Sequence, residues 1–92
     1  MNRHEAGLTS HARLLTAMGN ERRLSILLWL LKGEISVGVL SKNVGLSQSA
    51  LSQHLARLRV QGLVSTRREG PVIYYSSTNE SVKRIIETLA EL

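Results

Sequence analysis

A run of polar side chains near residue 50 has the chemistry to recognise another molecule through hydrogen bonds. On a helix over 48–61, the apolar Leu51, Leu55 and Leu58 share one narrow face that must point into a core. The opposite face carries hydroxyls, amides, guanidiniums and one methyl group, at Gln48, Ser49, Ser52, Gln53, Ala56, Arg57 and Arg59. A hydrated helix usually mixes Glu with Lys, whereas a helix in the major groove of DNA needs donors and acceptors and no anions. The pattern therefore favours a DNA-contacting helix.

The distribution of charge favours the same interpretation. The chain of 92 residues has a formal net charge of +5, and no acidic residue lies between Ile35 and Arg68. An acid-free centre between Glu-containing ends is typical of a surface that binds a polyanion, although a basic face can also be merely hydrated. The basic residues of this stretch are Lys42, Arg57, Arg59, Arg67 and Arg68.

Two helices are predicted before this segment. Apolar residues recur at helical spacing over 8–18, and Asn20 is placed to cap a second helix over 21–32. Trp29 lies outside the apolar stripe of that helix. We expect the stripe to be buried, and it consists of Leu24, Leu27, Leu28 and Leu31.

A helix-turn-helix is predicted over residues 36–61. Ser36 can cap a short helix that ends before Gly45, and Ser47 can cap the helix with the polar face. Two helices joined by a short turn that contains glycine are typical of this motif.

A β-hairpin is predicted after the helix-turn-helix. Residues 64–68 and 72–76 are rich in β-branched and aromatic side chains, and Glu69-Gly70-Pro71 separates them. Tyr74 and Tyr75 point to opposite faces, so one belongs to the core, and the sequence leaves open which. The hairpin, over 64–76, would form a wing beside the helix-turn-helix.

The two ends of the chain carry more apolar surface than so small a domain can cover. Asn79 can cap a last helix over 80–92, and this helix has a strong apolar stripe. Contact with a second copy across a two-fold axis would cover the excess, although the subunit's own core could use about half of it. The expected dimer residues are Leu14, Leu15, Met18, Val82, Ile85, Ile86 and Leu89.

Four short motifs stand at the joints of these elements. They are Asn-Glu-Arg-Arg-Leu at 20–24, Gly-Leu-Ser-Gln-Ser-Ala-Leu-Ser-Gln-His-Leu at 45–55, Gly-Leu-Val at 62–64, and Arg-Arg-Glu-Gly at 67–70 with Tyr74 and Tyr75. In this order the chain resembles the ArsR/SmtB family of small bacterial repressors, and within it the NolR/HlyU-like group. The resemblance implies a homodimer whose recognition helices enter successive major grooves of an imperfect palindrome.

The chain departs from the resembled family at its known sensor sites. Metal-sensing members carry Cys-Val-Cys where this chain has Ser-Val-Gly at 36–38, and there is no Cys for a thiol switch. The last helix has no His or Asp for zinc, and His4, His11 and His54 lack metal-site spacing. Pro71 replaces a basic residue common at the wing tip. We expect no metal and no cofactor, and whether an effector exists stays open.

The expected partners are double-stranded DNA and a second copy of the chain. Hydroxyls and amides of the predicted recognition helix would contact base edges, and Lys42 and the arginines would contact phosphates. His54 borders the apolar face and would make a structural hydrogen bond or a phosphate contact. The expected DNA-binding set is Ser47, Gln48, Ser49, Ser52, Gln53, His54, Arg57, Arg67, Arg68 and Lys42.

The predicted fold class is mainly α with a small β-hairpin: one winged helix-turn-helix domain over 1–92, of order ααααββα and homodimeric. The absence of Asp and of a nucleophile or phosphate-binding motif argues against an enzyme. Without a signal sequence or membrane span, we expect a cytoplasmic, nucleoid-associated protein. A winged module that binds proteins, or an anti-repressor that does not contact an operator, is the alternative.

Overall fold

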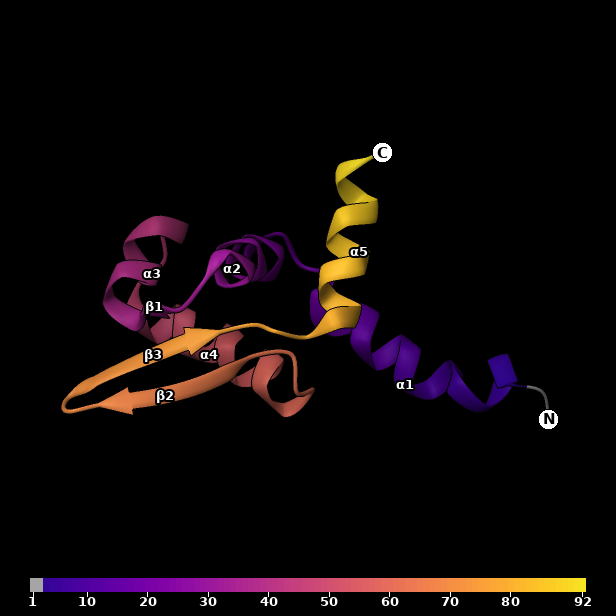
Figure 1. Cartoon of the computed structure of the whole chain (residues 1–92), viewed down its shortest axis with the longest axis horizontal. Coiled ribbons are helices and arrows are strands. Elements are labelled where there is room, and N and C mark those ends of the chain that lie inside the picture. The colour runs from indigo at the N-terminus through magenta and orange to yellow at the C-terminus, as the bar shows by residue number, and fades with distance from the viewer. Residues whose placement is uncertain (1–2) are drawn as a thin grey trace.

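The computed structural model describes the backbone of residues 3–92 and the side chains of residues 7–92. The elements of this part are α1 (Arg3–Met18), α2 (Glu21–Lys32), β1 (Ile35–Ser36), α3 (Val37–Val44), α4 (Gln48–Val60), β2 (Ser65–Glu69), β3 (Val72–Ser76) and α5 (Glu80–Ala90). The hairpin of β2 and β3 extends toward one end of the molecule, and α1 and α5 project at the other (Figure 1). None of the described helices has the length and apolar character needed to cross a bilayer.

Local side-chain chemistry sets the helix boundaries, as the sequence predicts. The Asn20 carboxamide oxygen accepts hydrogen bonds from the first backbone N–H groups of α2, and the Ser47 hydroxyl caps α4. Gly45 ends α3 and Gly62 follows α4, both with φ near +70°, at 69° and 70°. The Leu63 N–H also returns to the Leu58 carbonyl at 3.0 Å, which closes the last turn of α4. The helix-turn-helix is confirmed.

The sheet contains one strand more than the hairpin that the sequence predicts. Its order is β1-β3-β2, with Ile35 opposite Tyr75 and Glu69 opposite Val72. Only Gly70 and Pro71 connect β2 to β3, and Gly70 has φ of 59°, as the first central position of a type II′ turn requires. Strand β1 is too short to show a periodicity, so its pairing with β3 is decided by tertiary structure.

The core is centred on α2, but on a different face from the predicted one. Ile26, Leu27 and Leu30 are buried, whereas Leu28 is 49% exposed and the predicted Leu24 and Leu31 are only half-buried. The prediction was wrong because apolar residues surround this helix, so that spacing alone supports more than one buried stripe. The remaining large, fully buried side chains are Leu40, Leu51, Leu55, Leu58 and Val82.

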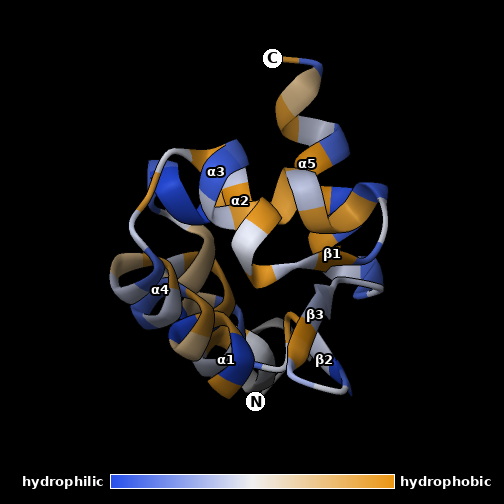
Figure 2. Ribbon diagram, turned by 90° about the vertical axis from the view of Figure 1, so that its left-hand side faces the viewer, coloured by the Kyte–Doolittle hydropathy of each residue, from blue (hydrophilic) through white to orange (hydrophobic). Residues whose placement is uncertain are grey.

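Helices α1 and α5 divide their apolar side chains between the core and the surface. Met18 and Val82 are 2% and 0% exposed within a single subunit, so they have no surface left for a partner. Leu15 and Leu89 are 56% and 43% exposed. Apolar and polar segments alternate along α5 as it leaves the body (Figure 2). Of the other expected dimer residues, Ile86 is buried, and Leu14 and Ile85 are half-buried.

Candidate nucleic-acid interface

The polar face of α4 is exposed, and the turn before it is fixed. Gln48, Ser49, Ser52, Gln53 and Arg57 are all exposed, as expected for a helix that contacts a ligand. In the preceding turn, the Ser41 hydroxyl donates to the Leu46 carbonyl, and the Leu46 N–H donates to the Ser41 carbonyl at 3.1 Å. These reciprocal hydrogen bonds hold α3 and α4 at a defined angle, so α4 is presented rigidly.

The Ser47 side chain caps the start of α4. Its hydroxyl accepts a hydrogen bond from the Ala50 N–H at 3.2 Å and lies 3.4 Å from the Ser49 hydroxyl. The first turn of α4 contains no acidic residue. Free N–H groups and the helix dipole make such a terminus favourable for a phosphate.

A cleft of about 550 Å³ separates α4 from the wing. Gln48 and Ser52 line it from α4, and Val72 and Tyr75 line it from β3. The side chains on this flank of α4 are therefore within the concave surface that the wing helps to form. The cleft is open, and its lining is both polar and apolar. Such a surface suits the hydrated sugar-phosphate backbone of DNA better than a compact apolar ligand.

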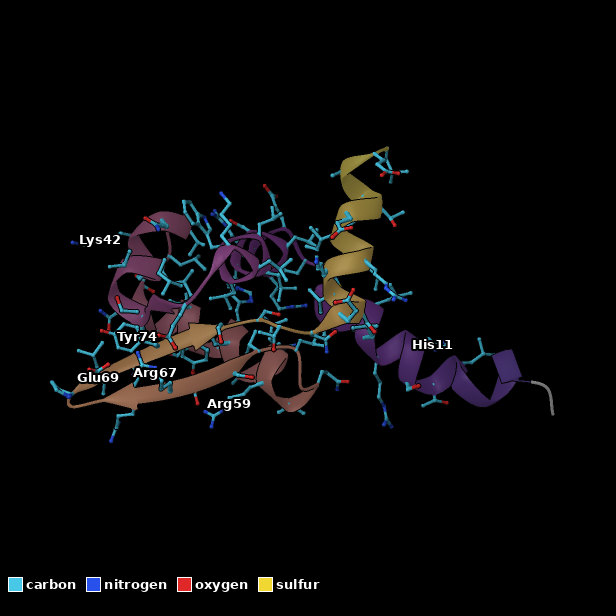
Figure 3. All side chains as sticks on the ribbon, in the orientation of Figure 1. His11, Lys42, Arg59, Arg67, Glu69 and Tyr74 are labelled. Carbon is cyan, nitrogen blue, oxygen red and sulfur yellow. The ribbon has the colours of Figure 1, made fainter. Side chains whose placement is uncertain are left out.

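Arg67 is held by the protein's own carboxylates. Its Nε and Nη2 donate to the two Glu34 oxygens at 3.0 and 2.8 Å, and its Nη1 donates to Glu69 Oε2 at 2.7 Å. The guanidinium also lies over the Tyr74 ring, 4.7 Å from its centre, and the group is clustered on the wing (Figure 3). These two carboxylates raise the pKa of Arg67, and the Arg67 hydrogen bonds lower the pKa of Glu34.

In this structure carboxylates engage the Arg67 guanidinium, which is not free for the expected phosphate contact. The cluster of Arg67, Glu34 and Glu69 holds one positive and two negative charges, so it does not attract a phosphate. Glu34 lies just before β1 and Arg67 in β2. Because the pair joins these strands, Arg67 positions the wing.

Other expected cations are accessible. Arg57, Arg68 and Lys42 are exposed, and among the described side chains none of them has a carboxylate within ion-pair distance. Lys42 lies at the end of α3, far from Arg59 at the end of α4 (Figure 3). The accessible positive charge is thus spread over α3, α4 and β2.

His54 points toward the body of the subunit. Its Nδ1 lies 3.3 Å from Nη1 of Arg23, and its side chain is half-buried between α2 and α4. Burial lowers the pKa of His54, and the positive charges of Arg23 and Arg57 lower it further. Of the two roles that the sequence left open, the geometry provides the structural hydrogen bond.

Arg23 is a polar residue of the core that the sequence reasoning missed. It is 8% exposed, and its guanidinium donates to the Ala17 and Thr16 carbonyls at the end of α1. The sequence contains a signal for this burial. Arg23 stands three, four and seven residues before the buried Ile26, Leu27 and Leu30, which places it on the same face of α2. Glu34 gives no comparable signal, since its partner is 33 residues away.

The described side chains contain no group of three or more His, Cys, Asp or Glu that could hold a metal ion. His11 lies on α1 and His54 on α4, in separate parts of the chain. His4 is outside the residues whose side chains the structure describes.

Comparisons with known proteins agree with this architecture. Residues 20–66 match the family described as "Bacterial regulatory protein, arsR family". The nodulation protein NolR of Rhizobium meliloti is 54% identical over 81 residues, which cover 88% of this chain and 66% of NolR. The transcriptional activator HlyU of Vibrio cholerae is 57% identical over 79 residues, which cover 86% of this chain and 73% of HlyU.

Solved structures give the same result. The crystal structure of NolR from Sinorhizobium fredii has a TM-score of 0.92 and 50% identity, and the match covers 99% of this chain and 92% of that one. A homodimeric winged helix-turn-helix DNA-binding domain from Mycobacterium bovis has a TM-score of 0.83 and 34% identity, with coverage of 98% and 84%. These matches confirm the winged helix-turn-helix and the likeness to the NolR/HlyU-like group. The chain belongs to the ArsR family of bacterial regulatory proteins.

Proposed function

We propose that the chain is a sequence-specific DNA-binding transcription regulator that occupies promoter DNA as a homodimer. The observation that carries this proposal is the exposed, acid-free face of α4, presented by a rigid helix-turn-helix. Its relatives NolR and HlyU are a nodulation protein and a transcriptional activator, which supports a regulatory role. A regulator of this kind would be found on the nucleoid.

Helix α4 would lie in the major groove with its polar face toward the bases. At about 100° per residue, Ser49, Ser52 and Gln53 fall in the middle of the exposed arc, between the wing on one side and α1 on the other. Gln53 has the donor and acceptor pair that matches the edge of adenine. Gln48, nearer the wing, would contact the flanking base or backbone.

Phosphate contacts would supply most of the affinity. Arg57 on α4, Arg68 on β2 and Lys42 on α3 are accessible cations, and the Ser47 end of α4 offers backbone N–H groups. Binding should therefore weaken steeply as salt rises. Arg67 would act indirectly, by holding the wing against the body.

The homodimer would form through the exposed apolar side chains of α1 and α5. Leu15 and Leu89 remain exposed after the subunit's core is complete, and Leu14 and Ile85 on the same two helices are half-buried. A two-fold axis through this end would present two α4 helices to half-sites about one helical turn apart, which defines an imperfect palindrome. Such a dimer would repress by competing with polymerase for the promoter.

Selection of genomic fragments by the purified full chain at physiological salt tests the proposal. We expect the retained fragments to share an imperfect palindrome with half-sites spaced by about one helical turn. A folded dimer that retains no motif, and instead binds a protein partner regardless of salt, would contradict the proposal and favour a protein-interaction module.

A further inference from the structure

A second cleft, separate from the α4–wing surface, lies between α1 and α4. Its volume is about 570 Å³, within the range of small-molecule sites. The lining contains small apolar groups and three guanidiniums but no carboxylate. The residues are Thr9, Ala12, Arg13, Thr16, Ala17, Arg23, Arg57, Val60 and Gln61.

Among the described side chains, no carboxylate pairs with the Arg23 guanidinium at the base of this cleft. Arg23 is 8% exposed, and its guanidinium has as hydrogen-bond partners the Thr16 and Ala17 carbonyls and the His54 ring, which carry no negative charge. Carbonyls at the end of α1 supply partial negative charge only. Burial lowers the pKa of Arg23, and the nearby Arg57 lowers it further, so this corner favours negative charge. An anion in the cleft would offset the repulsion among these groups.

The apolar part of the lining indicates what else the ligand must carry. Val60 is 82% exposed although it is apolar, and Ala12 and Ala17 lie across the cleft from it on α1. A ligand with an apolar body would cover these groups, whereas a fully hydrated ion would leave them in water. Exposed Arg13 and Arg57 at the rim have the planar donor geometry that binds a carboxylate through two hydrogen bonds.

We propose that the α1–α4 cleft binds a small organic carboxylate with an apolar body. The carboxylate is held by Arg13 and Arg57 at the rim, above Arg23, and the apolar body lies against Val60 and Ala12. The cleft is on a different face of α1 from the exposed Leu8 and Leu15, about 100° around the helix. A second subunit that contacts Leu8 and Leu15 would therefore approach α1 from a different face.

A ligand bound in this cleft would also change the affinity for DNA, and this consequence rests on the proposed function. Arg57 lines the cleft and also projects from the polar face of α4. A carboxylate that engages Arg57 removes one phosphate contact and lowers the affinity for DNA. Binding to the cleft itself does not depend on DNA.

The first test measures ligand binding without DNA, with octanoate as the probe and the His54 ring signals followed by NMR. We expect saturable binding and a rise in the pKa of His54, because the anion offsets the nearby positive charge. Arg13→Gln should weaken binding by about tenfold or more, because it removes a charge-assisted hydrogen bond. Ala12→Trp fills the cleft and should also weaken binding by about tenfold or more. Inorganic phosphate should bind at least about tenfold more weakly than octanoate, since it cannot cover the apolar lining.

Arg84→Gln is the matched control, because it removes one exposed arginine from α5, outside the cleft. Equal weakening in this variant, or no saturable octanoate binding to the folded protein, would overturn the site. If Ala12→Trp dissociates the dimer and octanoate does not bind, the cleft belongs to the subunit contact and the proposal fails.

The second test measures DNA affinity with and without octanoate. The wild-type chain should lose affinity when octanoate is added, and Ala12→Trp should not. Octanoate binding with unchanged DNA affinity would confirm the site and contradict its effect on DNA. DNA binding without octanoate binding would refute the site and leave the proposed function intact.

Discussion

The arginines of this chain occupy three environments that residue type does not distinguish. Arg23 is buried at the end of α1, Arg67 is held between Glu34 and Glu69, and Arg57 and Arg68 are exposed. Only the exposed ones can exchange water and counter-ions for phosphate contacts. Whether an arginine can contact DNA therefore depends on the acceptors to which its guanidinium already donates hydrogen bonds.

Gln53 should contribute sequence preference. Gln53→Ala should weaken binding to the selected site by about 1–3 kcal/mol, because a bidentate contact with one base is lost. Binding to random DNA should hardly change. The measurement is a competition titration with each single-base variant of the selected site, with the exposed Gln61→Ala as the control. An equal loss on specific and random DNA would remove Gln53 from the base-contacting set.

Arg68 should contribute a phosphate contact. Arg68→Ala should weaken binding to all sequences alike and reduce the slope of log K against log salt by about one. The slope is measured by fluorescence anisotropy at several salt concentrations. Lys83→Ala, on the exposed surface of α5, removes the same charge at the other end of the molecule and should leave the slope unchanged. An unchanged slope for Arg68→Ala would exclude the contact.

His54 should make stability depend on pH. Because its folded pKa lies below the ordinary value of 6.5, the unfolded chain binds the proton more readily. The free energy of unfolding should therefore fall as the pH drops from 6.5 toward the lowered pKa. Urea unfolding at pH 7.5 and at several lower pH values measures this loss, which His54→Gln should remove. His11→Gln, at an exposed position, should retain it, and identical behaviour of the two variants would contradict the assignment.

At the scale of elements, the wing is joined to the body by the β1–β3 strand pairing, by one ion pair and by hydrogen bonds at its base. The Arg67–Glu34 pair links β2 to the segment before β1, and at the base of the wing the Ser77 N–H donates to the Leu30 carbonyl of α2 at 3.3 Å. The Ser77 hydroxyl also donates to the Leu63 carbonyl at 2.7 Å. The base is thus fixed by buried hydrogen bonds and the middle of β3 by its pairing with β1, and the exposed Arg67–Glu34 ion pair adds to this attachment.

Glu34→Gln should loosen the wing without affecting α4. Loss of the carboxylate leaves the Arg67 guanidinium with only Glu69, so amides of β2 should exchange with solvent faster, while those of α4 keep their protection. Hydrogen exchange followed by NMR measures both. Glu80→Gln, which removes an exposed carboxylate of α5, is the matched control.

The same ion pair should respond to acid. The folded pKa of Glu34 is lowered, so the contribution of this pair is present above the ordinary value of 4.5 and is lost as the pH falls through the lowered pKa. Exchange of the β2 amides in the wild-type chain should approach that of Glu34→Gln at such pH values. A wild-type wing that stays equally protected throughout would show that the pair does not hold it.

At the scale of the whole molecule, the surfaces proposed to contact DNA and a second copy lie apart. The subunit is elongated, with extents of 48 × 28 × 21 Å. The hairpin and α3 lie at one end, and α1 and α5 project at the other (Figure 1). This separation would let one surface contact DNA while the other contacts a second copy.

Leu15→Glu should dissociate the proposed homodimer. A charge placed in an apolar contact loses its hydration, so the dimer Kd should rise on the order of 100-fold. Sedimentation equilibrium measures the Kd, and circular dichroism checks that the subunit remains folded. Leu28→Glu is the matched control, since Leu28 on α2 is similarly exposed at 49% against 56% for Leu15. Equal dissociation by both variants, or by neither, would contradict the proposed interface.

Much of the fold could be predicted because its signals are local. Asn20, Ser47 and Asn79 mark helix starts through hydrogen bonds to the next turn, and Gly45 and Gly62 mark ends through backbone conformations that other residues rarely adopt. The polar face of α4 is likewise contained in thirteen consecutive residues. The sequence by itself therefore determined the helix-turn-helix, the wing and the exposed face that would contact DNA.

Tertiary structure alone decided the contacts between distant residues. It paired Arg67 with Glu34, turned His54 toward Arg23, added β1 to the sheet and selected one face of the leucine-rich α2. The physical reason is that a side chain's type fixes what it can donate or bury, whereas its partner depends on how distant segments pack. A cation between two carboxylates and a cation free for phosphate are identical in sequence and differ only in those neighbours.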